Sequence, residues 1–367
     1  MCGICGVVSA APLTETERAQ VRAMNASLRH RGPDGAGEFV HARVALAMRR
    51  LSIIDLTGGG QPLFNEDRSL ALIANGEIYN DLELRAGLIA RGHSFRSGSD
   101  CETILHLYED YGPDCVRHLR GMFAFALWDA GQRRLMLARD RMGEKPLYLV
   151  EHAGQLWFAS ELRALLTAGV AELSLDPNAI DHYFHFQYVP EPATPLQGVR
   201  KLDAAELCLV ETDPWRICER RYWCMEDSPP LEGNPATRLR ERLVEVSRLV
   251  VRADVPVGVA LSGGLDSSAV AALAAVHYPG TLHAFSVGYP GRPASDERAD
   301  ARALAQHLEL HYHEVELETS ELVAHFPTLV DAQDDPIADI AGLGYASLSC
   351  RARECGVPVL LQGQGGG

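Results

Sequence analysis

The hydrophobic pattern of this 367-residue sequence changes near residue 238, and that change constrains the fold more than any other feature. Before it, short apolar runs are joined by tight turns. Residues 122–128 and 134–138, for example, flank Asp129-Ala130-Gly131-Gln132, which is the signal of a β-hairpin. After it, apolar strands alternate with stretches of helical spacing. We therefore expect antiparallel sheets with covering helices in the first part and a parallel sheet with helices on both faces in the second.

The individual elements follow from the same patterns. In the first part, residues 147–150 and 156–159 predict a second hairpin, and helical spacing predicts helices around 82–89 and 104–108. In the second part, the sequence predicts helices over 239–250, 267–277 and 296–308 and strands over 255–261, 282–287, 312–317 and 357–361. The predicted domains are residues 2–210 and 238–367, joined by a Pro- and Gly-containing connecting segment, 211–237.

A cysteine directly follows the initiator methionine. Removal of Met1 would place a free α-amine, with a pKa of about 8, beside the thiol of Cys2. Such an amine can act as the base that activates a nucleophile. Taken alone, Cys2 is more often a buried strand residue, or one half of a Cys2-x-x-Cys5 redox or metal pair. No second pair of zinc ligands stands out at a suitable spacing, so Cys5 is expected to be a strand residue.

Four further segments give this cysteine a context. In chain order they are His30-Arg31-Gly32-Pro33-Asp34-Gly35, Arg50-Leu51-Ser52-Ile53-Ile54-Asp55, Asn75-Gly76-Glu77-Ile78-Tyr79-Asn80 and Ser99-Asp100-Cys101-Glu102. Together with Cys2, they resemble the class II, N-terminal-nucleophile glutaminase domain found in asparagine synthetases. The resemblance implies an α+β sandwich with the layer order helix–sheet–sheet–helix over residues 2–210, and it implies glutamine as a substrate.

The same resemblance implies roles for the residues of these segments. The cysteine would attack glutamine, and the Asn75 side chain and the Gly76 backbone N–H would form the oxyanion hole. Arg50 would hold the α-carboxylate as a bidentate pair, and the acidic Glu77 and Asp100 would bind the α-ammonium group. Each residue also has an ordinary alternative. Arg50 could be a surface charge, Asn75-Gly76 a hairpin turn and Asp100 a helix N-cap.

A strand, a Gly-rich turn and a helix open the second part. Residues 257–261 lead into Ser262-Gly263-Gly264-Leu265-Asp266-Ser267-Ser268, and an Ala-rich helix follows. Such a turn presents backbone N–H groups and the positive end of a helix dipole to an anion. It lacks the Lys of a Walker A loop. It resembles the SGGxDS pyrophosphate loop of enzymes that split ATP into AMP and pyrophosphate, whereas the ordinary alternative is a turn with Ser267 as N-cap.

The second resemblance implies an ATP site in an incomplete α/β pyrophosphate-loop domain. The ATP-binding residues that it predicts are Leu261, Ser262, Gly263, Gly264, Asp266, Ser267, Ser268, Val287, Gly363 and Gln364. Leu261 and Val287 end neighbouring parallel strands, where adenosine would lie. Asp266 is the predicted Mg²⁺ ligand, since Mg²⁺ prefers carboxylate and phosphate oxygens. The family also has acidic residues near Asp296-Glu297, and residues 335–339 resemble its segment that approaches aspartate and the adenylate.

The last seven residues, 361–367, depart from the family pattern. They look like the family's S-G-E-G-x-D-E loop cut short, with Gln364 where Glu is usual and Gly367 where Asp is usual. Glutamine can form hydrogen bonds but cannot take up a proton or hold a cation by charge. Family members continue well beyond this loop, so the resemblance implies a C-terminally truncated synthetase domain.

Composition and charge limit the classes of partner and the cellular location that are expected. A formal charge of −15 argues against nucleic acid, because phosphate binding needs a basic face. The sequence has no basic leader and no run of about 18 apolar residues, which argues against secretion and against a membrane partner. Its nine cysteines are odd in number and scattered, as in reduced proteins, so a cytoplasmic location is expected. The oligomeric state stays open, with a homodimer among the alternatives.

The reaction implied is glutamine-dependent asparagine synthesis from aspartate and ATP. Ammonia released from glutamine would displace AMP from β-aspartyl-AMP, giving asparagine, glutamate, AMP and pyrophosphate. Three alternatives remain open at this stage. The chain could amidate another carboxylate, it could act only as a glutaminase, or it could be a non-catalytic relative that binds a partner or a nucleotide.

Overall fold

The computed structural model of the chain describes residues 1–292, 296–339 and 341–363. These residues form two compact units. The first comprises Met1–Pro229 and the short segment Asp334–Ile337, and the second comprises the remainder from Pro230 onwards. None of the helices in the described ranges is both long enough and apolar enough to cross a membrane.

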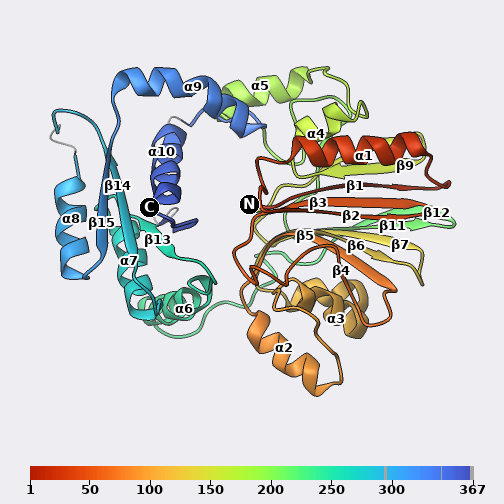
Figure 1. Cartoon of the computed structure of the whole chain (residues 1–367), viewed down its shortest axis with the longest axis horizontal. Helices are drawn as coiled ribbons and strands as arrows, with labels where there is room; N and C mark the ends of the chain where they lie inside the picture. The colour runs from red at the N-terminus through yellow and green to blue at the C-terminus, as the bar shows by residue number, and fades with distance from the viewer. Residues whose placement is uncertain (293–295, 340, 364–367) are drawn as a thin grey trace. The chain divides into compact units, whose positions relative to one another are not determined.

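Two antiparallel six-stranded sheets form the first unit (Figure 1). One sheet has the order β10 (Arg200–Lys201), β8 (Tyr148–His152), β9 (Gln155–Ala159), β1 (Gly3–Ser9), β3 (Val44–Arg50) and β2 (Gly35–His41). The other has the order β12 (Trp215–Arg221), β11 (Glu206–Thr212), β7 (Arg134–Arg139), β6 (Gly121–Asp129), β5 (Leu70–Ile78) and β4 (Leu63–Phe64). The β6–β7 and β8–β9 pairs confirm both hairpins expected from the sequence.

Helices cover the outer faces of these two sheets. They are α1 (Glu15–Ser27) and α4 (Leu162–Thr167) on the first sheet and α2 (Asp81–Ala90), α3 (Glu102–Tyr111) and the 3-10 turn η1 (Gly112–His118) on the second, whereas α5 (Pro177–Phe186) buries only Ala179. Apolar side chains of both sheets, such as Ile4 and Ile73, form one buried cluster between the sheets. A second cluster lies between the first sheet and helices α1 and α4, and a third between the second sheet and α3. The layer order is therefore helix–sheet–sheet–helix, as predicted.

Local sequence features explain how β1 and α1 reach their places. A side chain at Gly6 in β1 would come within 2.5 Å of the Ala45 carbonyl oxygen on β3. Glycine therefore lets β1 pack closely against β3 and against the ring of Phe158 in β9. Helix α1 begins with a capping box, in which the Glu17 carboxylate accepts a hydrogen bond from the backbone N–H of Thr14 at 2.5 Å.

A parallel sheet forms the centre of the second unit. In the described part of the chain it has four strands, in the order β15 (His311–Glu316), β14 (His283–Gly288), β13 (Val257–Ala260) and β16 (Val359–Leu361). The helices are α6 (Pro235–Val250), α7 (Leu265–His277), α8 (Arg298–His307), α9 (Thr319–Gln333) and α10 (Ala341–Glu354). The strands and the helices α6, α7 and α8 lie where the sequence predicted them, within a few residues.

Helices cover both faces of this sheet. On one face, Val257 and Val259 of β13 pack with Ala271 of α7 and Ala301 of α8. On the other face, Phe285 of β14 packs with residues of α10. This confirms the α/β class expected for the second part. It also places the carboxyl ends of β13, β14 and β16 at one edge, where ligands of such sheets bind.

The division between the two compact units falls inside the predicted connecting segment, 211–237. That segment begins within β11 and includes β12, which pairs with β11 along its whole length. The division between the two compact units falls between Pro229 and Pro230. The prolines and glycine beyond residue 228 do mark the connection. The strand before them is not evident from the sequence, because its alternating polar residues resemble those of a linker.

Candidate active site

One cavity of the first unit is lined by all six residues predicted to handle glutamine. They are Cys2, Arg50, Asn75, Gly76, Glu77 and Asp100. They come from four places in the chain: the start of β1, the end of β3, the second half of β5 and the loop before α3. Because β1 and β5 belong to different sheets, the cavity lies at one end of the sandwich, where the two sheets meet.

Cys2 is half-buried at the start of β1. Its Sγ accepts a hydrogen bond from the backbone N–H of Leu51 at 3.4 Å. Its carbonyl oxygen accepts one from Nε of Arg31 at 2.9 Å, and Arg31 is held in turn by the buried Glu161 at 2.9 Å. These contacts hold the cysteine backbone and direct the thiol into the cavity. Cys5, by contrast, is fully buried in β1, as predicted.

Arg50 is not a loose surface charge. One NH2 group donates to the carbonyl oxygens of Ile54 at 3.0 Å and Asp55 at 2.6 Å. A Cβ at Gly59 would lie 2.4 Å from that same nitrogen, so a larger residue there would displace the guanidinium. The guanidinium is thereby fixed in the wall of the cavity, with its planar edge suited to a carboxylate.

Asn75 and Gly76 lie within β5 and are not a hairpin turn. The side chain of Asn75 is 1% exposed, and neither its Oδ1 nor its Nδ2 has a hydrogen-bond partner among the described residues. A buried amide without partners costs about 1–3 kcal/mol, which is the signature of a group reserved for a ligand. Glycine at 76 is required for packing as well, since a Cβ there would lie 2.1 Å from the Met122 carbonyl oxygen.

Glu77 and Asp100 supply two buried carboxyl groups to the cavity. Burial raises the pKa of Glu77 to about 8, and the nearby Asp100 charge acts in the same direction. Burial also raises the pKa of Asp100 to about 6. The Asp100 carboxylate accepts a hydrogen bond from the backbone N–H of Ile78 at 2.6 Å, and the N-cap position of α3 is Cys101. Asp100 therefore does not cap α3, and the pair offers a strong site for a cation.

Lys145 also lines this cavity, although no sequence motif singles it out. It is 6% exposed, and burial lowers the pKa of its ammonium group. It sits in a turn organised by Asp140, whose carboxylate accepts hydrogen bonds from the backbone N–H groups of Met142, Glu144 and Lys145. The available signal was an Asp followed by a Gly- and Pro-containing turn that carries a lysine.

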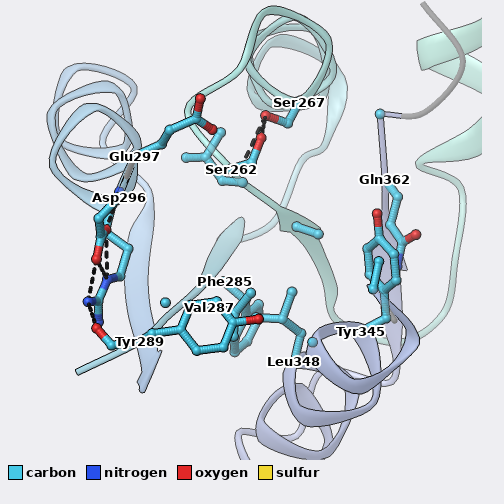
Figure 2. Close-up of a pocket in the computed structure, with 17 residues that line it drawn as sticks. Ser262, Ser267, Phe285, Val287, Tyr289, Asp296, Glu297, Tyr345, Leu348 and Gln362 are labelled. Atoms are coloured by element: carbon cyan, nitrogen blue, oxygen red, sulfur yellow. Dashed lines mark hydrogen bonds and ion pairs between the residues drawn. The ribbon is translucent and has the colours of Figure 1, made fainter. Parts of the chain in front are cut away.

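A second cavity, of about 340 Å³, lies in the second unit at the carboxyl ends of β13 and β14 (Figure 2). Five predicted ATP residues line it: Leu261, Ser262, Ser267, Val287 and Gly363. Further lining residues that the sequence did not indicate include Phe285, Tyr289, Tyr345 and Leu348. The last two come from α10, a helix that the sequence did not predict. Aromatic and aliphatic walls around a Gly- and Ser-rich turn suit a nucleoside with its phosphates.

The turn between β13 and α7 is held by its own hydroxyl groups. The hydroxyls of Ser262 and Ser267 lie 2.9 Å apart, and the backbone N–H of Ser262 donates to Oγ of Ser267 at 3.2 Å. Gly263 has φ +96°, a conformation that glycine adopts without strain. Gly264 is the N-cap of α7, so Ser267 is not the cap. The turn therefore aims the amino end of α7 along the cavity edge.

Four further predicted ATP residues border this turn and are not part of the cavity lining. Gly263, Gly264, Asp266 and Ser268 belong to the turn or to the first residues of α7. Gly363 packs against it, because a Cβ at that position would lie 2.7 Å from the carbonyl carbon of Asp266. Gln364 and Gly367 lie outside the described residues.

Acidic residues near this cavity differ in their surroundings. Asp296 forms an ion pair of 2.5 Å with the buried Arg298, whose hydrogen bond lowers the pKa of Asp296 to about 2. Asp266 is half-buried in the first turn of α7. The group of potential metal ligands in the described part of the chain consists of Glu66, His93, His106 and Glu109 and does not include Asp266. Any Mg²⁺ at Asp266 would thus be held mainly by phosphate oxygens, which is common for this ion.

The segment beginning at Asp334 is divided between the units. Residues Asp334–Ile337 belong to the first. There the carboxylate of Asp334 accepts hydrogen bonds from the backbone N–H groups of Leu162 and Arg163, and Asp335 pairs with Lys201 at 2.5 Å. The predicted approach of residues 335–339 to aspartate and the adenylate stays a prediction.

Comparison with protein families gives two matches that divide the chain. Residues 1–223 match the family described as "Glutamine amidotransferase domain". Residues 238–367 match the family described as "Asparagine synthase". The first match covers more than half of the chain and includes every residue of the first cavity named above.

Individual relatives align over the whole chain. It is 36% identical over 369 residues to "Asparagine synthetase [glutamine-hydrolyzing] 1" of Bacillus subtilis, and 35% identical over 382 residues to "Asparagine synthetase [glutamine-hydrolyzing] 2" of Arabidopsis thaliana. It spans 58% and 60% of the length of these two proteins. A solved structure described as "Structure of the allosteric regulatory enzyme of purine biosynthesis" is 16% identical over 99% of this chain and 90% of its own, with a TM-score of 0.48. The chain belongs to the glutamine amidotransferase family, with an asparagine synthase domain following in the arrangement of its asparagine synthetase relatives.

Proposed function

We propose that this chain carries out the glutamine-hydrolysing half-reaction of asparagine synthesis, and that the protein couples it to ATP-dependent amidation of aspartate. One observation carries the proposal. A single cavity gathers a thiol, a fixed guanidinium, a buried unpartnered amide and two buried carboxyl groups. These are the groups needed to attack a carboxamide and to hold the two charged ends of an amino acid. The aspartate acceptor rests on the similarity to asparagine synthetases.

The glutaminase step begins when Met1 has been removed. The α-amine of Cys2, directly or through water, takes the thiol proton, and the thiolate attacks the side-chain carbonyl carbon of glutamine. Asn75 Nδ2 and the Gly76 backbone N–H donate hydrogen bonds to the developing oxyanion. The protonated α-amine then returns this proton to the amide nitrogen, the C–N bond breaks, and ammonia leaves a glutamyl thioester on Cys2. Water then hydrolyses this thioester to glutamate and restores the thiol.

Binding of glutamine uses both signs of charge. Arg50 pairs with the α-carboxylate, and Glu77 and Asp100 pair with the α-ammonium group. Both acids have raised pKa values in the free protein because they are buried. An ammonium group between them favours their ionised forms and lowers these pKa values. The two ends of glutamine are thereby distinguished by charge.

In the second unit, ATP occupies the cavity beside the Ser262–Ser268 turn. The adenosine contacts Leu261 and Val287, and the pyrophosphate lies at the amino end of α7. Mg²⁺ bound to Asp266 and the phosphates would supply positive charge to the leaving pyrophosphate. Ammonia from the first unit displaces AMP from the activated β-carboxylate of aspartate and forms asparagine.

The test follows three products together. The purified chain is incubated with glutamine, ATP and Mg²⁺, with and without aspartate, and glutamate, pyrophosphate and asparagine are quantified against a Cys2→Ala control. Mass spectrometry establishes whether Met1 has been removed. Asparagine and pyrophosphate formed in parallel with Cys2-dependent glutamate would support the whole reaction.

The other outcomes are equally informative. Glutamate without pyrophosphate or asparagine would support the glutaminase alone and contradict synthesis by this stretch of chain. Pyrophosphate release that depends on a carboxylate other than aspartate would identify a different acceptor. Absence of glutamate from the processed protein would overturn the proposal.

A further inference from the structure

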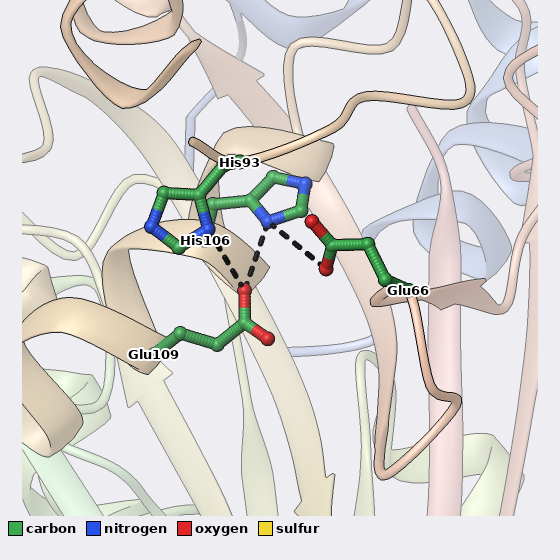
Figure 3. Close-up of side chains that lie close together, drawn as sticks. All are labelled: Glu66, His93, His106 and Glu109. Carbon is green, nitrogen blue, oxygen red and sulfur yellow. Dashed lines mark hydrogen bonds and ion pairs between the residues drawn. The ribbon is translucent and has the colours of Figure 1, made fainter. Parts of the chain in front are cut away.

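A second group of chemically active side chains lies in the first unit, apart from the glutamine cavity. It consists of Glu66, His93, His106 and Glu109 (Figure 3). His106 and Glu109 are three residues apart on α3 and therefore share one face of that helix. His93 comes from the turn after α2, and Glu66 from the turn between β4 and β5. Three separate segments thus bring two imidazoles and two carboxylates together.

We propose that these four residues bind one divalent transition-metal ion, with Zn²⁺ as the ion best suited to the donors. Imidazole nitrogen and carboxylate oxygen are common zinc ligands, and four such donors complete a tetrahedral site. The site is separate from the glutaminase cavity and does not depend on the proposed reaction. Its function would be to tie α3 to the two turns beside it.

The distances between donor atoms fit such an ion. Oε2 of Glu109 lies 2.9 Å from Nδ1 of His106 and 3.3 Å from Nδ1 of His93. Oε2 of Glu66 lies 3.8 Å from Nδ1 of His106, and all four donors lie within 4.8 Å of one another. Donors at zinc bond lengths of 2.0–2.2 Å on a tetrahedron are separated by about 3.3–3.6 Å. Binding would require only modest side-chain movement.

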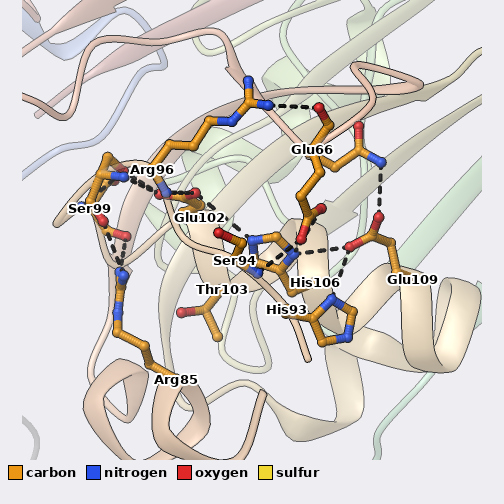
Figure 4. A network of polar contacts seen from close by, with 12 residues as sticks. Glu66, Arg85, His93, Ser94, Arg96, Ser99, Glu102, Thr103, His106 and Glu109 are labelled. Carbon is orange, nitrogen blue, oxygen red and sulfur yellow. Dashed lines mark hydrogen bonds and ion pairs between the residues drawn. The ribbon is translucent and has the colours of Figure 1, made fainter. Parts of the chain in front are cut away.

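The outward-facing atoms of two ligands are held by other residues, as in established metal sites. Figure 4 shows the polar network in which Glu66, His93, His106 and Glu109 lie. Nε2 of His93 lies 2.9 Å from Oδ1 of Asp110, the carboxylate–histidine arrangement that orients an imidazole toward a metal. Oε1 of Glu109 accepts a hydrogen bond from the Asn65 side chain at 2.8 Å. The ligating faces of His93 and Glu109 therefore point toward each other.

The other two ligands are supported in a similar way. Oε1 of Glu66 accepts a hydrogen bond from the backbone N–H of Ser94 at 2.9 Å. Nε2 of the fully buried His106 lies 3.8 Å from Glu102 and has no hydrogen-bond partner among the described residues. Burial differs across the site, from 0% exposure of the His106 side chain to 38% for Glu66. An ion can therefore reach the site from the exposed side, at Glu66, and contact the buried His106 on the other side.

Charge favours a cation at this place. With neutral imidazoles, Glu66 and Glu109 bring two negative charges to the donor cluster, while Asp110, directly behind His93, is already paired with Arg91 at 2.7 Å. The ordinary alternative is a network of ion pairs with one or both histidines protonated. The two imidazole rings lie 5.0 Å apart, so two positive charges would repel across that distance. A single divalent ion satisfies the same carboxylates without that repulsion.

Metal titration of the full chain tests the proposal. Chelator-treated protein is titrated with Zn²⁺ by calorimetry and with Co²⁺ by visible absorption, which reports four-coordinate geometry. Accessible thiols, including Cys2, are alkylated beforehand so that they do not bind either ion. We expect one equivalent of each ion to bind saturably, with the Co²⁺ spectrum of a tetrahedral nitrogen and oxygen site.

Variants then locate the ion. His93→Ala and Glu109→Gln each remove one ligand and should abolish saturable binding. His152→Ala and Glu151→Gln, in the β8–β9 hairpin, are matched controls and should bind normally. Asp110→Asn leaves all four donors in place but should weaken binding by about 10–100-fold, since it removes the group that orients His93. Circular dichroism checks the fold of every variant.

Two results would overturn the proposal. One is the absence of saturable Zn²⁺ and Co²⁺ binding to the alkylated wild-type protein. The other is binding of equal affinity in the wild type, Asp110→Asn and the His93 and Glu109 variants, which would place the ion elsewhere. Because Asp110→Asn retains every ligand, the proposal stays testable even where a ligand variant fails to fold.

Discussion

The Asp100 carboxylate accepts a 2.6 Å hydrogen bond from the backbone N–H of Ile78, the residue that follows Glu77 in β5. This bond joins the loop before α3 to the end of a central strand. It brings two acidic side chains, far apart in the sequence, to one buried cavity. Their proximity is unfavourable while both are ionised, and this gives the site a measurable dependence on pH.

The first prediction concerns stability. Burial and the Asp100 charge raise the pKa of Glu77 from 4.5 to about 8, so the protonated form is the one that favours folding. The stabilisation that protonated Glu77 gives to the folded state is fully present below pH 4.5 and is lost as the pH rises through about 8. Glu77→Gln keeps this position uncharged. Its free energy of unfolding should therefore exceed that of the wild type by an amount that grows between pH 4.5 and 8, measured by urea unfolding.

A matched variant separates this effect from a general change in charge. Glu232→Gln removes an exposed carboxylate in the segment that joins the two units. It should not change the pH dependence of stability in this range. Glu77→Gln less stable than the wild type at pH 8 would contradict the burial argument.

The second prediction concerns glutamine hydrolysis. In the proposed mechanism, the α-ammonium group binds to ionised Glu77 and Asp100, and burial raises the pKa values of these acids in the free protein to about 8 and about 6. We therefore expect kcat/KM for glutamine to rise with pH between about 6 and 8. The effect should appear mainly in KM, since these residues bind substrate and do not contact the reacting carbonyl. Initial rates of glutamate formation across this range test it.

Removing one acid should simplify that profile. Asp100→Asn should abolish the lower inflection and raise KM, while kcat at saturating glutamine changes less. An unchanged pH profile of kcat/KM in Asp100→Asn would contradict the proposed role of Asp100 in binding the α-ammonium group.

The third prediction isolates the amide of Asn75. Since neither of its polar atoms has a partner among the described residues, its replacement breaks no hydrogen bond in the free protein. Asn75→Ala should therefore change Tm little, yet lower kcat by about 10²–10³, the usual loss for an oxyanion-hole donor. A large fall in Tm together with normal kcat would assign Asn75 a structural role.

The sequence predicted the elements with strong periodicity and the residues of the glutaminase motifs. Two hairpins, the parallel sheet and its first helices follow from local hydrophobic spacing. The six residues predicted to handle glutamine were recognised as an ordered set, and the fold brings them to one cavity. Local patterns sufficed because five of these residues lie in or next to β1, β3 and β5, whose positions are set by the sheets, and the Asp100–Ile78 hydrogen bond ties the loop before α3 to β5.

Other features could not be predicted, because they depend on contacts between distant segments. Helix α10 has only weak apolar periodicity, so Tyr345 was not expected beside the ATP turn. Lys145 is polar and sits in a turn, and only its burial makes it notable. The cluster of His93 and His106 with two glutamates has no motif spacing, since its members come from three segments.

The fourth prediction tests why residue 76 is glycine. A Cβ at this position would lie 2.1 Å from the Met122 carbonyl oxygen and 2.6 Å from Cα of Phe123, so β5 and β6 would have to separate. Gly76→Ala should destabilise the first unit by about 1–3 kcal/mol or more and abolish glutaminase activity. Gly87→Ala is the matched control, because a Cβ added there, on the exposed face of α2, would meet nothing within 4 Å among the described residues. That control should retain activity and gain up to about 1 kcal/mol.

The fifth prediction concerns the ATP turn and its contact with the last described residue. A Cβ at Gly363 would lie 2.7 Å from the carbonyl carbon of Asp266 and 2.8 Å from the backbone nitrogen of Ser267. Both contacts are with backbone, so Gly363→Ala must displace the amino end of α7 that would bind the pyrophosphate. A cost of about 1–3 kcal/mol at this position corresponds to ATP binding that is roughly 5–150-fold weaker.

Gly344→Ala provides the comparison within the same cavity. Its added Cβ would meet only Val287 Cγ1 at 3.5 Å, an ordinary contact, so ATP affinity should be nearly unchanged. Equilibrium binding of a fluorescent ATP analogue to the two variants and the wild type measures the difference. Equal affinity in all three proteins would show that the loop carrying Gly363 does not position the turn. Weaker binding only in Gly363→Ala would show that the turn and this loop act as one phosphate-binding surface.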